Sequence, residues 1–115
     1  MKVNESKQGD ILVLAIAGRI IDPKKINLFH DLVRGHIEKG QKYFIIDLKK
    51  VEITNSLGLG MLVGTYASVK RAEGRLVLAN VDSIKDLIIM MRLTVLFDIY
   101  DSLEEAVESF EVPVV

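Results

Sequence analysis

The chain has 115 residues, a mass of 12.9 kDa and a formal net charge of −1 at pH 7. Half of its residues are hydrophobic and 27% are charged, which is typical of one folded domain and unlike disordered or fibrous chains. The longest apolar run, Ile11–Ala17, is far shorter than the roughly 18 residues of a membrane-spanning helix. The polar start predicts no signal peptide. We therefore expect a cytoplasmic protein with one domain, residues 1–112, and a short tail, residues 113–115.

The cysteine content and the net charge exclude several kinds of site and argue against some binding partners. The sequence contains no cysteine, which excludes disulfides, thiolate zinc sites and cysteine nucleophiles. A net charge near zero argues against a general affinity for nucleic acid or anionic membranes. The charge is uneven, however, because no Lys or Arg follows Leu93, and we interpret the acidic residues there as a solvated face of the last helix. These residues are Asp98, Asp101, Glu104, Glu105, Glu108 and Glu111.

The first forty residues predict two strands and a helix. The strands, Val3–Lys7 and Ile11–Gly18, are joined by a tight turn. The second is apolar without alternation, as in a strand covered on both faces. Asp22 followed by Pro23 predicts an N-cap and a first helical position, and the helix should end near Gly40.

The middle of the chain predicts a strand, a long helix and another strand. Tyr43–Ile46 is a buried strand that leads through Asp47 into a loop. A helix from about Ser56 to Glu73 follows, and Gly74 closes it. Leu76–Ala79 is the next strand. Strands that alternate with helices predict a partly parallel sheet.

The last third predicts a helix over Ser83–Leu93, a short edge strand at Phe97–Tyr100 and a final helix. Ser102 with Glu105 forms the capping box of that final helix, whose apolar stripe ends at Phe110. Three further apolar residues of the third helix are either core or part of a binding patch, and we favour core: Ile89, Met90 and Leu93. We therefore predict an α/β fold, a mixed four- to five-stranded sheet with about four helices in the order ββαβαβα(β)α.

Two histidines are the only candidates for imidazole chemistry. His30 and His36 are six residues apart on one helix, about 120° around its axis, so they do not share a metal ion. His36 falls in an apolar stripe, where a packed, hydrogen-bonded ring is expected. No G-x-S-x-G motif supports a Ser-His-acid triad, although the sequence alone leaves one open. We expect no catalytic residues, metal or cofactor, and therefore no enzyme.

One glycine cluster approximates a dinucleotide-binding motif. Gly58, Gly60 and Gly64 lie in a G-x-G-x-x-x-G run, but such a run should follow a strand directly, and about ten residues separate it from Ile46. On a helical wheel, Gly60 and Gly64 share a face with Leu57 and Met61. Glycine within a helix costs about 0.5–1 kcal/mol relative to Ala, so this face is either a docking surface or a site of close intramolecular packing. We favour docking.

The start of this helix also offers a site for modification. Asn55 or Ser56 is an ordinary N-cap. A phosphate on Ser56 would meet free backbone N–H groups and the positive end of the helix dipole. It would also place charge beside Leu57, so that a partner packed there would dissociate.

These motifs resemble a known family. The chain has Asp47-Leu48 at a strand end, then Val51, and Asn55–Gly60 (NSLGLG) opens a helix, with Leu76–Asn80 and Leu96-Phe97 further on. This arrangement resembles the STAS domain family, specifically the small stand-alone anti-sigma factor antagonists of bacteria. The resemblance covers nearly the whole chain.

The resemblance implies a binding module. In the family, the unphosphorylated antagonist binds an anti-sigma factor that is also a serine kinase, and a serine phosphatase reverses the phosphorylation. The acceptor serine falls on Ser56, the family glycines fall on Gly58 and Gly60, and ATP would belong to the partner. Two departures stand out: Asn55 replaces the family's aspartate, and Asp22 lies one residue later than the family's loop aspartate. Either the loop holds an extra residue and Asp22 takes the family's place at the partner surface, or Asp22 serves only as the helix cap, which we favour.

Three functions thus stay open. The first is an antagonist that phosphorylation of Ser56 switches off. The second is a STAS domain that acts as a constitutive adaptor in a signalling assembly. The third, and least favoured, is a small-nucleotide-binding domain that uses Gly58–Gly64.

Overall fold

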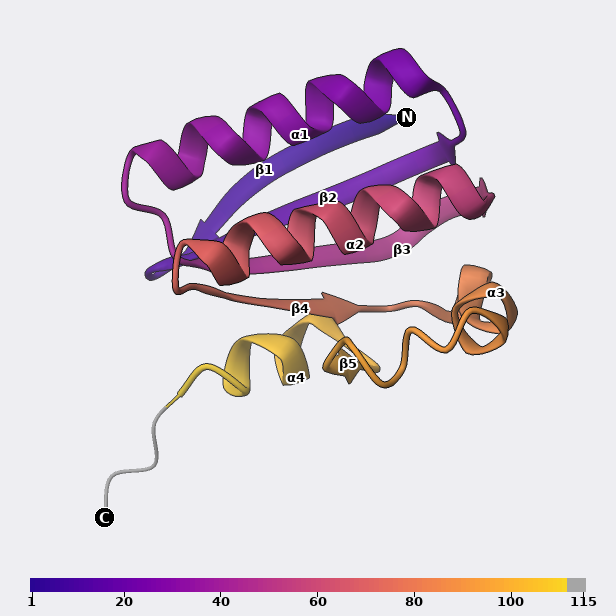
Figure 1. The fold of residues 1–115 in the computed structure, drawn as a ribbon. Coiled ribbons are helices and arrows are strands. Elements are labelled where there is room, and N and C mark those ends of the chain that lie inside the picture. Colours follow the sequence, from indigo (N-terminus) through magenta and orange to yellow (C-terminus); the bar gives the residue numbers. More distant parts are fainter. Residues whose placement is uncertain (112–115) are drawn as a thin grey trace.

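A five-stranded sheet in the spatial order β1-β2-β3-β4-β5 organises the chain in the computed structural model, which describes residues 1–111 (Figure 1). β1 is antiparallel to β2, and each later pair of neighbours is parallel. The strands are β1 (Lys2–Gln8), β2 (Ile11–Ile20), β3 (Tyr43–Thr54), β4 (Arg75–Ala79) and β5 (Ile99–Tyr100). The predicted mixed α/β fold is confirmed, and the predicted tail, residues 113–115, lies outside the described residues.

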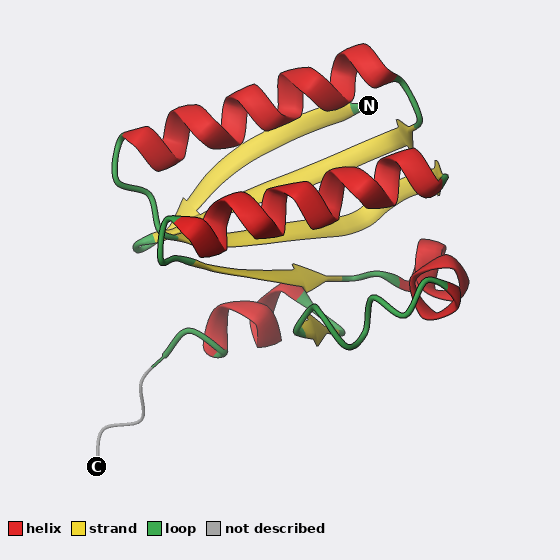
Figure 2. Cartoon of the chain, in the orientation of Figure 1, coloured by secondary structure: helices red, strands yellow, loops and turns green. Residues whose placement is uncertain are grey.

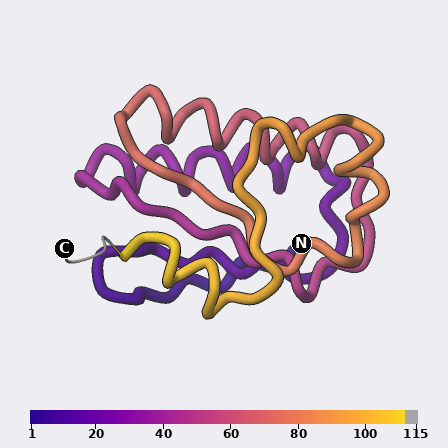
Figure 3. The backbone as a smooth tube through the Cα atoms, turned by 90° about the horizontal axis from the view of Figure 1, so that it is seen from below, coloured from indigo at the N-terminus to yellow at the C-terminus, as the bar shows by residue number. Residues whose placement is uncertain are grey.

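The helices lie on both sides of the sheet (Figure 2). Two long helices cover one face, which we call the first face, and the short α4 packs on the second face, so that the sheet separates α4 from the long helices (Figure 3). The helices are α1 (Pro23–Glu38), α2 (Ser56–Arg71), the 3-10 turn η1 (Asp82–Ile84), α3 (Lys85–Met90) and α4 (Leu103–Glu108). Within residues 1–111, no helix is long and apolar enough to cross a membrane.

Alternate residues of β2 enter different cores, which explains why its sequence shows no polar alternation. Leu12, Leu14 and Ile16 belong to the cluster under α1 and α2. Ile11 and Val13 point to the other side and belong to the cluster under α4. The prediction that this strand is covered on both faces is confirmed for its first half.

β3 is longer than predicted. The sequence predicted a strand that ends at Ile46, but β3 continues to Thr54. Leu48 and Val51 stay buried, and β2 pairs with β3 as far as Ile20↔Thr54, with two register shifts on the way. Polar Lys49 and Lys50 hid this continuation because they face solvent at those irregular positions.

The third helix is shorter than predicted. A 3-10 turn precedes α3, and the helix ends at Met90 because Arg92 adopts a left-handed conformation with φ of 57°. Leu93 is buried as predicted, but the assignment of Ile89 and Met90 to the core is wrong, since their exposed fractions are 52% and 74%. Both side chains therefore face solvent.

The predicted N-caps at two helix starts are confirmed. The Asp22 side chain accepts a hydrogen bond from the Lys24 N–H at 3.0 Å, and Pro23 is the first residue of α1. The Ser102 hydroxyl accepts one from the Glu105 N–H at 3.1 Å at the start of α4.

Gly74 has a different role at the end of α2 from the helix-closing role that the sequence predicted. Glu73, not Gly74, takes the left-handed conformation, with φ of 61°. Gly74 is needed because a Cβ there would collide with the carbonyl oxygen of Lys42 and lie 2.9 Å from a methyl carbon of Val69. Close packing between two chain segments therefore explains this glycine.

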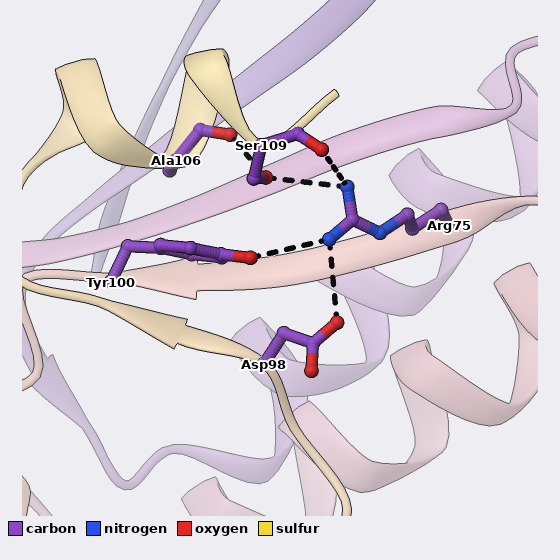
Figure 4. Close-up of polar contacts among 5 residues, drawn as sticks. All are labelled: Arg75, Asp98, Tyr100, Ala106 and Ser109. Atoms are coloured by element: carbon purple, nitrogen blue, oxygen red, sulfur yellow. Dashed lines mark hydrogen bonds and ion pairs between the residues drawn. The ribbon is translucent and has the colours of Figure 1, made fainter. Parts of the chain in front are cut away.

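Arg75 joins the C-terminal elements to the sheet (Figure 4). Its guanidinium donates hydrogen bonds to the backbone oxygen and the hydroxyl of Ser109, at 2.8 and 3.2 Å. It also donates to Asp98 and to the Tyr100 hydroxyl, both at 3.3 Å, and lies 4.6 Å from the centre of the Phe110 ring. One side chain of β4 thus connects β5 with the end of α4.

Candidate functional site

The start of α2 lies at the carboxyl end of β3, where the Asn55 side chain caps the helix. Asn55 Oδ1 accepts a hydrogen bond from the Gly58 N–H at 3.1 Å, and the Asn55 carbonyl accepts the first helical bond from Leu59 at 3.0 Å. Thr54, the residue before Asn55, is held in place because its hydroxyl donates a hydrogen bond to the Ile20 carbonyl at the end of β2, at 3.0 Å. Of the two caps that the sequence allowed, Asn55 therefore fills this role.

Ser56 is consequently left free for other chemistry. It is the first residue of α2 and is exposed, and the cap does not use its hydroxyl. The N–H groups of Ser56 and Leu57 precede the first intrahelical bond and point out of the helix start. No acidic residue lies in the first turn of α2, whereas Lys70 and Arg71 lie in the last. The positive end of the helix dipole is therefore not neutralised within the helix itself.

The helical wheel was wrong about Met61. It placed Met61 on the docking face, but the residue is only 1% exposed and belongs to the core of the first face. The backbone carbonyl of Met61 accepts hydrogen bonds from Thr65 Oγ1 at 2.8 Å and from Nε2 of His30 at 3.2 Å. Since α1 packs beside α2 here, the helix has more than one buried side, and a wheel divided into two halves misassigns the positions between them.

Gly58 and Gly64 serve packing within the chain. A Cβ at Gly58 would lie 2.5 Å from the Ile20 carbonyl oxygen and collide with Thr54 Oγ1. A Cβ at Gly64 would lie 3.2 Å from Nε2 of His30. Only Gly60 has open space around it, so the close approach that the helical glycines predicted is intramolecular at two of the three positions.

An exposed strip therefore runs along the start of α2, and we call it the α2 strip: Asn55, Ser56, Leu57 and Gly60. Leu57 is 45% exposed and supplies the apolar part of this strip. The glycine leaves a bare stretch of helix beside it. Because Ser56 is within the strip, a charge added there would change the surface that surrounds it.

Asp22 lies at the start of α1, which begins at the same end of the sheet as α2 (Figure 1). Its side chain caps α1, as favoured from the sequence. The pKa of the nearby Met1 amino group is lowered, first because partial burial disfavours its charged form and second because of the neighbouring Lys25.

A cleft with a volume of about 190 Å³ separates the end of β3 from η1 and α3. Glu52 and Ile53 line one side, and Asp82 and Asp86 line the other. Ile53 is 49% exposed and precedes the α2 strip by two residues. The sequence did not single it out because Glu52-Ile53 was predicted as loop, and an apolar residue in a loop carries no periodic signal.

The structure changes the argument about nucleotides. The spacing argument against a G-x-G motif was wrong, since β3 ends at Thr54 and α2 begins at Ser56. The glycines are nevertheless engaged elsewhere, because Gly58 packs on Ile20 and Gly64 on His30. A phosphate-binding loop needs glycines that leave room for the ligand, and only Gly60 does so.

The two histidines point in different directions from α1. His30 donates to α2, and Nε2 of His36 lies 2.5 Å from the Glu5 carboxylate of β1. His36 is half-buried and hydrogen-bonded, as predicted. Within residues 1–111, no group of three or more His, Asp or Glu side chains is arranged to hold a metal ion.

Comparison with known proteins identifies a matching family profile and solved structures with a similar fold. The profile of the STAS domain matches residues 2–106. No curated protein sequence that was compared with the chain matches it.

Three solved structures have the same fold. A candidate anti-sigma factor antagonist from Thermotoga maritima is 22% identical, with a TM-score of 0.84, and covers 93% of this chain and 92% of its own. An anti-sigma factor antagonist from Mycobacterium paratuberculosis is 20% identical, with a TM-score of 0.80 and coverage of 94% and 92%. The Bacillus cell fate determinant SpoIIAA in its phosphorylated form is 15% identical, with a TM-score of 0.74 and coverage of 96% and 100%.

Proposed function

The chain belongs to the STAS domain family, and we propose that it acts as an anti-sigma factor antagonist. Its partner would be an anti-sigma factor with serine kinase activity, in the cytoplasm. Phosphorylation of Ser56 would switch it off, and a serine phosphatase would restore it. The chain itself would be a substrate and ligand, with ATP bound by the partner.

The observation that carries this proposal is the exposed, uncommitted hydroxyl of Ser56. Asn55 caps the helix, so a kinase can modify Ser56 without breaking the hydrogen bond that starts α2. Asn55 keeps the capping role of the family's aspartate, because its amide oxygen accepts the bond that a carboxylate would accept, but it removes a negative charge beside Ser56.

The α2 strip explains how one phosphate can control binding. The modification adds about −1.5 to −2 charges next to the half-exposed Leu57. A partner packed on Leu57 and Gly60 would have to desolvate that charge. A penalty of about 3 kcal/mol weakens binding by about 100-fold. The helix itself tolerates the phosphate because its positive end is there.

The direct test uses a purified anti-sigma factor of the serine kinase class from the source organism. The full chain is incubated with this kinase and ATP, and intact-mass and peptide mass spectrometry locate the phosphate. We expect one phosphate, at Ser56, and none on Ser56→Ala. Ser83→Ala is the matched control, because Ser83 is also exposed and lies in η1 at the same end of the molecule. A kinase that binds the chain but never modifies Ser56 would refute the switch.

Binding measurements separate the switch from a constitutive adaptor. We expect unmodified chain and Ser56→Ala to bind the anti-sigma factor equally, and the phosphorylated chain to bind about 100-fold more weakly. Leu57→Asp should weaken binding in the unmodified chain, because it puts a charge on the same surface. If Ser56→Ala, Ser56→Asp and the phosphorylated chain all bind alike, the protein is an adaptor.

A further inference from the structure

The second face of the sheet is only partly covered, and a groove runs beside α4. Two hollows with volumes of about 650 and 380 Å³ share Asp47 and Lys49 in their linings, so they form one continuous groove. The larger hollow lies against α4, and the smaller extends toward the start of β1. Ala15 and Ala17 line the smaller hollow, and these short side chains leave it open.

The two ends of the groove carry opposite charges. Lys2 and Lys50 line only the smaller hollow, and Lys49 lines both hollows where they join; we call these three residues the lysine wall. Glu104 and Glu108, one turn apart on α4, line the other end and form the glutamate wall. All five side chains are exposed, and none belongs to an ion pair among residues 1–111. Each wall therefore presents side chains of one sign that form no ion pair within residues 1–111, while Asp47 lies between the two walls.

The shape of this face is also divided in two. α4 rises above one half of the second face by about 10 Å, the usual distance between packed layers. The other half is floored by the two alanines, which do not belong to the cluster of described residues that packs under α4. About a two-fold axis, the raised half of one molecule can pack into the hollow half of an identical molecule, and the reverse contact forms at the same time.

We propose that a second copy of this chain occupies the groove, with α4 of each copy lying in the hollow of the other. The glutamate wall of one copy meets the lysine wall of its partner, and symmetry repeats the contact. The acidic C-terminal segment, which the proposed switch at Ser56 does not use, is thereby explained. This proposal is independent of the proposed function, because α2 lies on the opposite face and Ser56 stays exposed in the dimer.

A second copy fits the groove better than a free anion does. Asp47, Glu104 and Glu108 line the same groove as the lysines, so the groove offers no uniformly positive surface to a free phosphate. A second copy supplies both complementary charges at once: carboxylates for the lysine wall and lysines for the glutamate wall. The charges of both walls are exposed to solvent, so salt screens the attraction between them and the dimer should weaken as the salt concentration rises.

A charge-exchange experiment on the full chain tests the proposal. The first variant carries Glu104→Lys and Glu108→Lys, and the second carries Lys49→Glu and Lys50→Glu. Sedimentation velocity at low salt, over concentrations up to about 1 mM, measures self-association. We expect the wild type to dimerise, and each variant alone to associate at least about tenfold more weakly, because like charges then face each other.

The equimolar mixture of the two variants is the decisive sample. In a mixed dimer both contacts again join opposite charges, so we expect heterodimers about as stable as the wild-type dimer. This recovery also shows that both variants are folded. Glu38→Lys, which reverses an exposed charge on α1, is the control and should dimerise like the wild type.

Three results would overturn the proposal: a wild type that stays monomeric at about 1 mM and low salt, dimerisation that survives both charge reversals, or variants that fail to associate when mixed although each is folded by circular dichroism. A monomeric wild type that binds inorganic phosphate at the lysine wall would assign the groove to an anion instead.

Discussion

The two faces of the sheet are buried to very different extents. The core under α1 and α2 contains 22 buried hydrophobic residues, whereas the core under α4 contains six. Along β2 the side chains on the second face shrink from Ile11 and Val13 to Ala15 and Ala17, and these two alanines do not belong to the cluster of described residues under α4. The first face thus holds the fold together, and the second leaves surface available. Polar bonds from Arg75 supplement the small core there.

The largest expected effect compares neighbouring isoleucines on opposite faces. Ile45 and Ile46 are both fully buried in β3, but Ile46 faces α1 and α2 and Ile45 faces α4. Both changes to Ala remove the same atoms, within the range of about 2–5 kcal/mol for such substitutions. We expect Ile46→Ala to lie near the top of this range and Ile45→Ala near the bottom, because the short α4 can move to fill the space.

Urea unfolding measures both losses, and hydrogen exchange localises them. Ile45→Ala should increase exchange mainly in α4, while Ile46→Ala should increase it throughout the sheet. Equal losses, or a larger loss at Ile45, would contradict the view that the second face is the weaker layer.

Substitutions at two glycines of α2 test how closely this helix packs on the first face of the sheet. Gly58→Ala should destabilise the fold by about 1–3 kcal/mol, because the new Cβ would meet Thr54 and the Ile20 carbonyl. Gly60→Ala has open space and should stabilise the helix by about 0.5–1 kcal/mol. Thermal unfolding should therefore shift in opposite directions. A shift in the same direction for both would show that helix propensity, not packing, decides.

Removal of the Arg75 guanidinium tests how strongly its hydrogen bonds hold α4 and β5 to the sheet. Arg75→Met keeps an apolar chain of similar length but loses the bonds to Ser109, Asp98 and Tyr100. The guanidinium is about one-third exposed, so we expect a modest loss of about 1–2 kcal/mol. Hydrogen exchange should show faster opening of α4 with little change in β2. Arg75→Lys keeps the charge without the planar group, and full recovery in that variant would contradict the importance of the guanidinium geometry.

The smallest change in stability is expected at Ser56, at the exposed start of α2. Ser56→Asp adds a carboxylate at the positive end of α2, where no acidic residue lies in the first turn. We expect stabilisation by about 0.3–1 kcal/mol at low salt, less at high salt. Ser56→Asn is the uncharged control. Destabilisation that persists at high salt would show that packing around Ser56, not the helix dipole, dominates.

Features encoded within a few neighbouring residues were predictable from the sequence. The caps at Asp22 and Ser102 depend on one side chain and an N–H two or three residues away, and both were identified. The order of strands and helices followed from apolar periodicity in the same way. Ser56 and Leu57 were assigned to an exposed helix start, and they are exposed there.

Tertiary structure alone decided the features that depend on distant neighbours. Met61 is buried because α1 packs beside α2, and no pattern within α2 reports the position of another helix. β3 extends past Asp47 because β2 continues to pair with it, and that pairing joins residues about thirty positions apart. Gly58 and Gly74 looked like a docking position and a helix end, but each accommodates a carbonyl from elsewhere in the chain.

The distribution of charge shows the same difference between what the sequence determines and what the tertiary structure decides. The sequence by itself determined that the acidic residues gather after Leu93 and that the chain can form one mixed α/β domain. Only the tertiary structure placed two of those glutamates across a groove from three lysines, far apart in the sequence. Local interactions select elements, whereas the surfaces on which partners bind arise from packing between elements, and that packing is not encoded in any single segment.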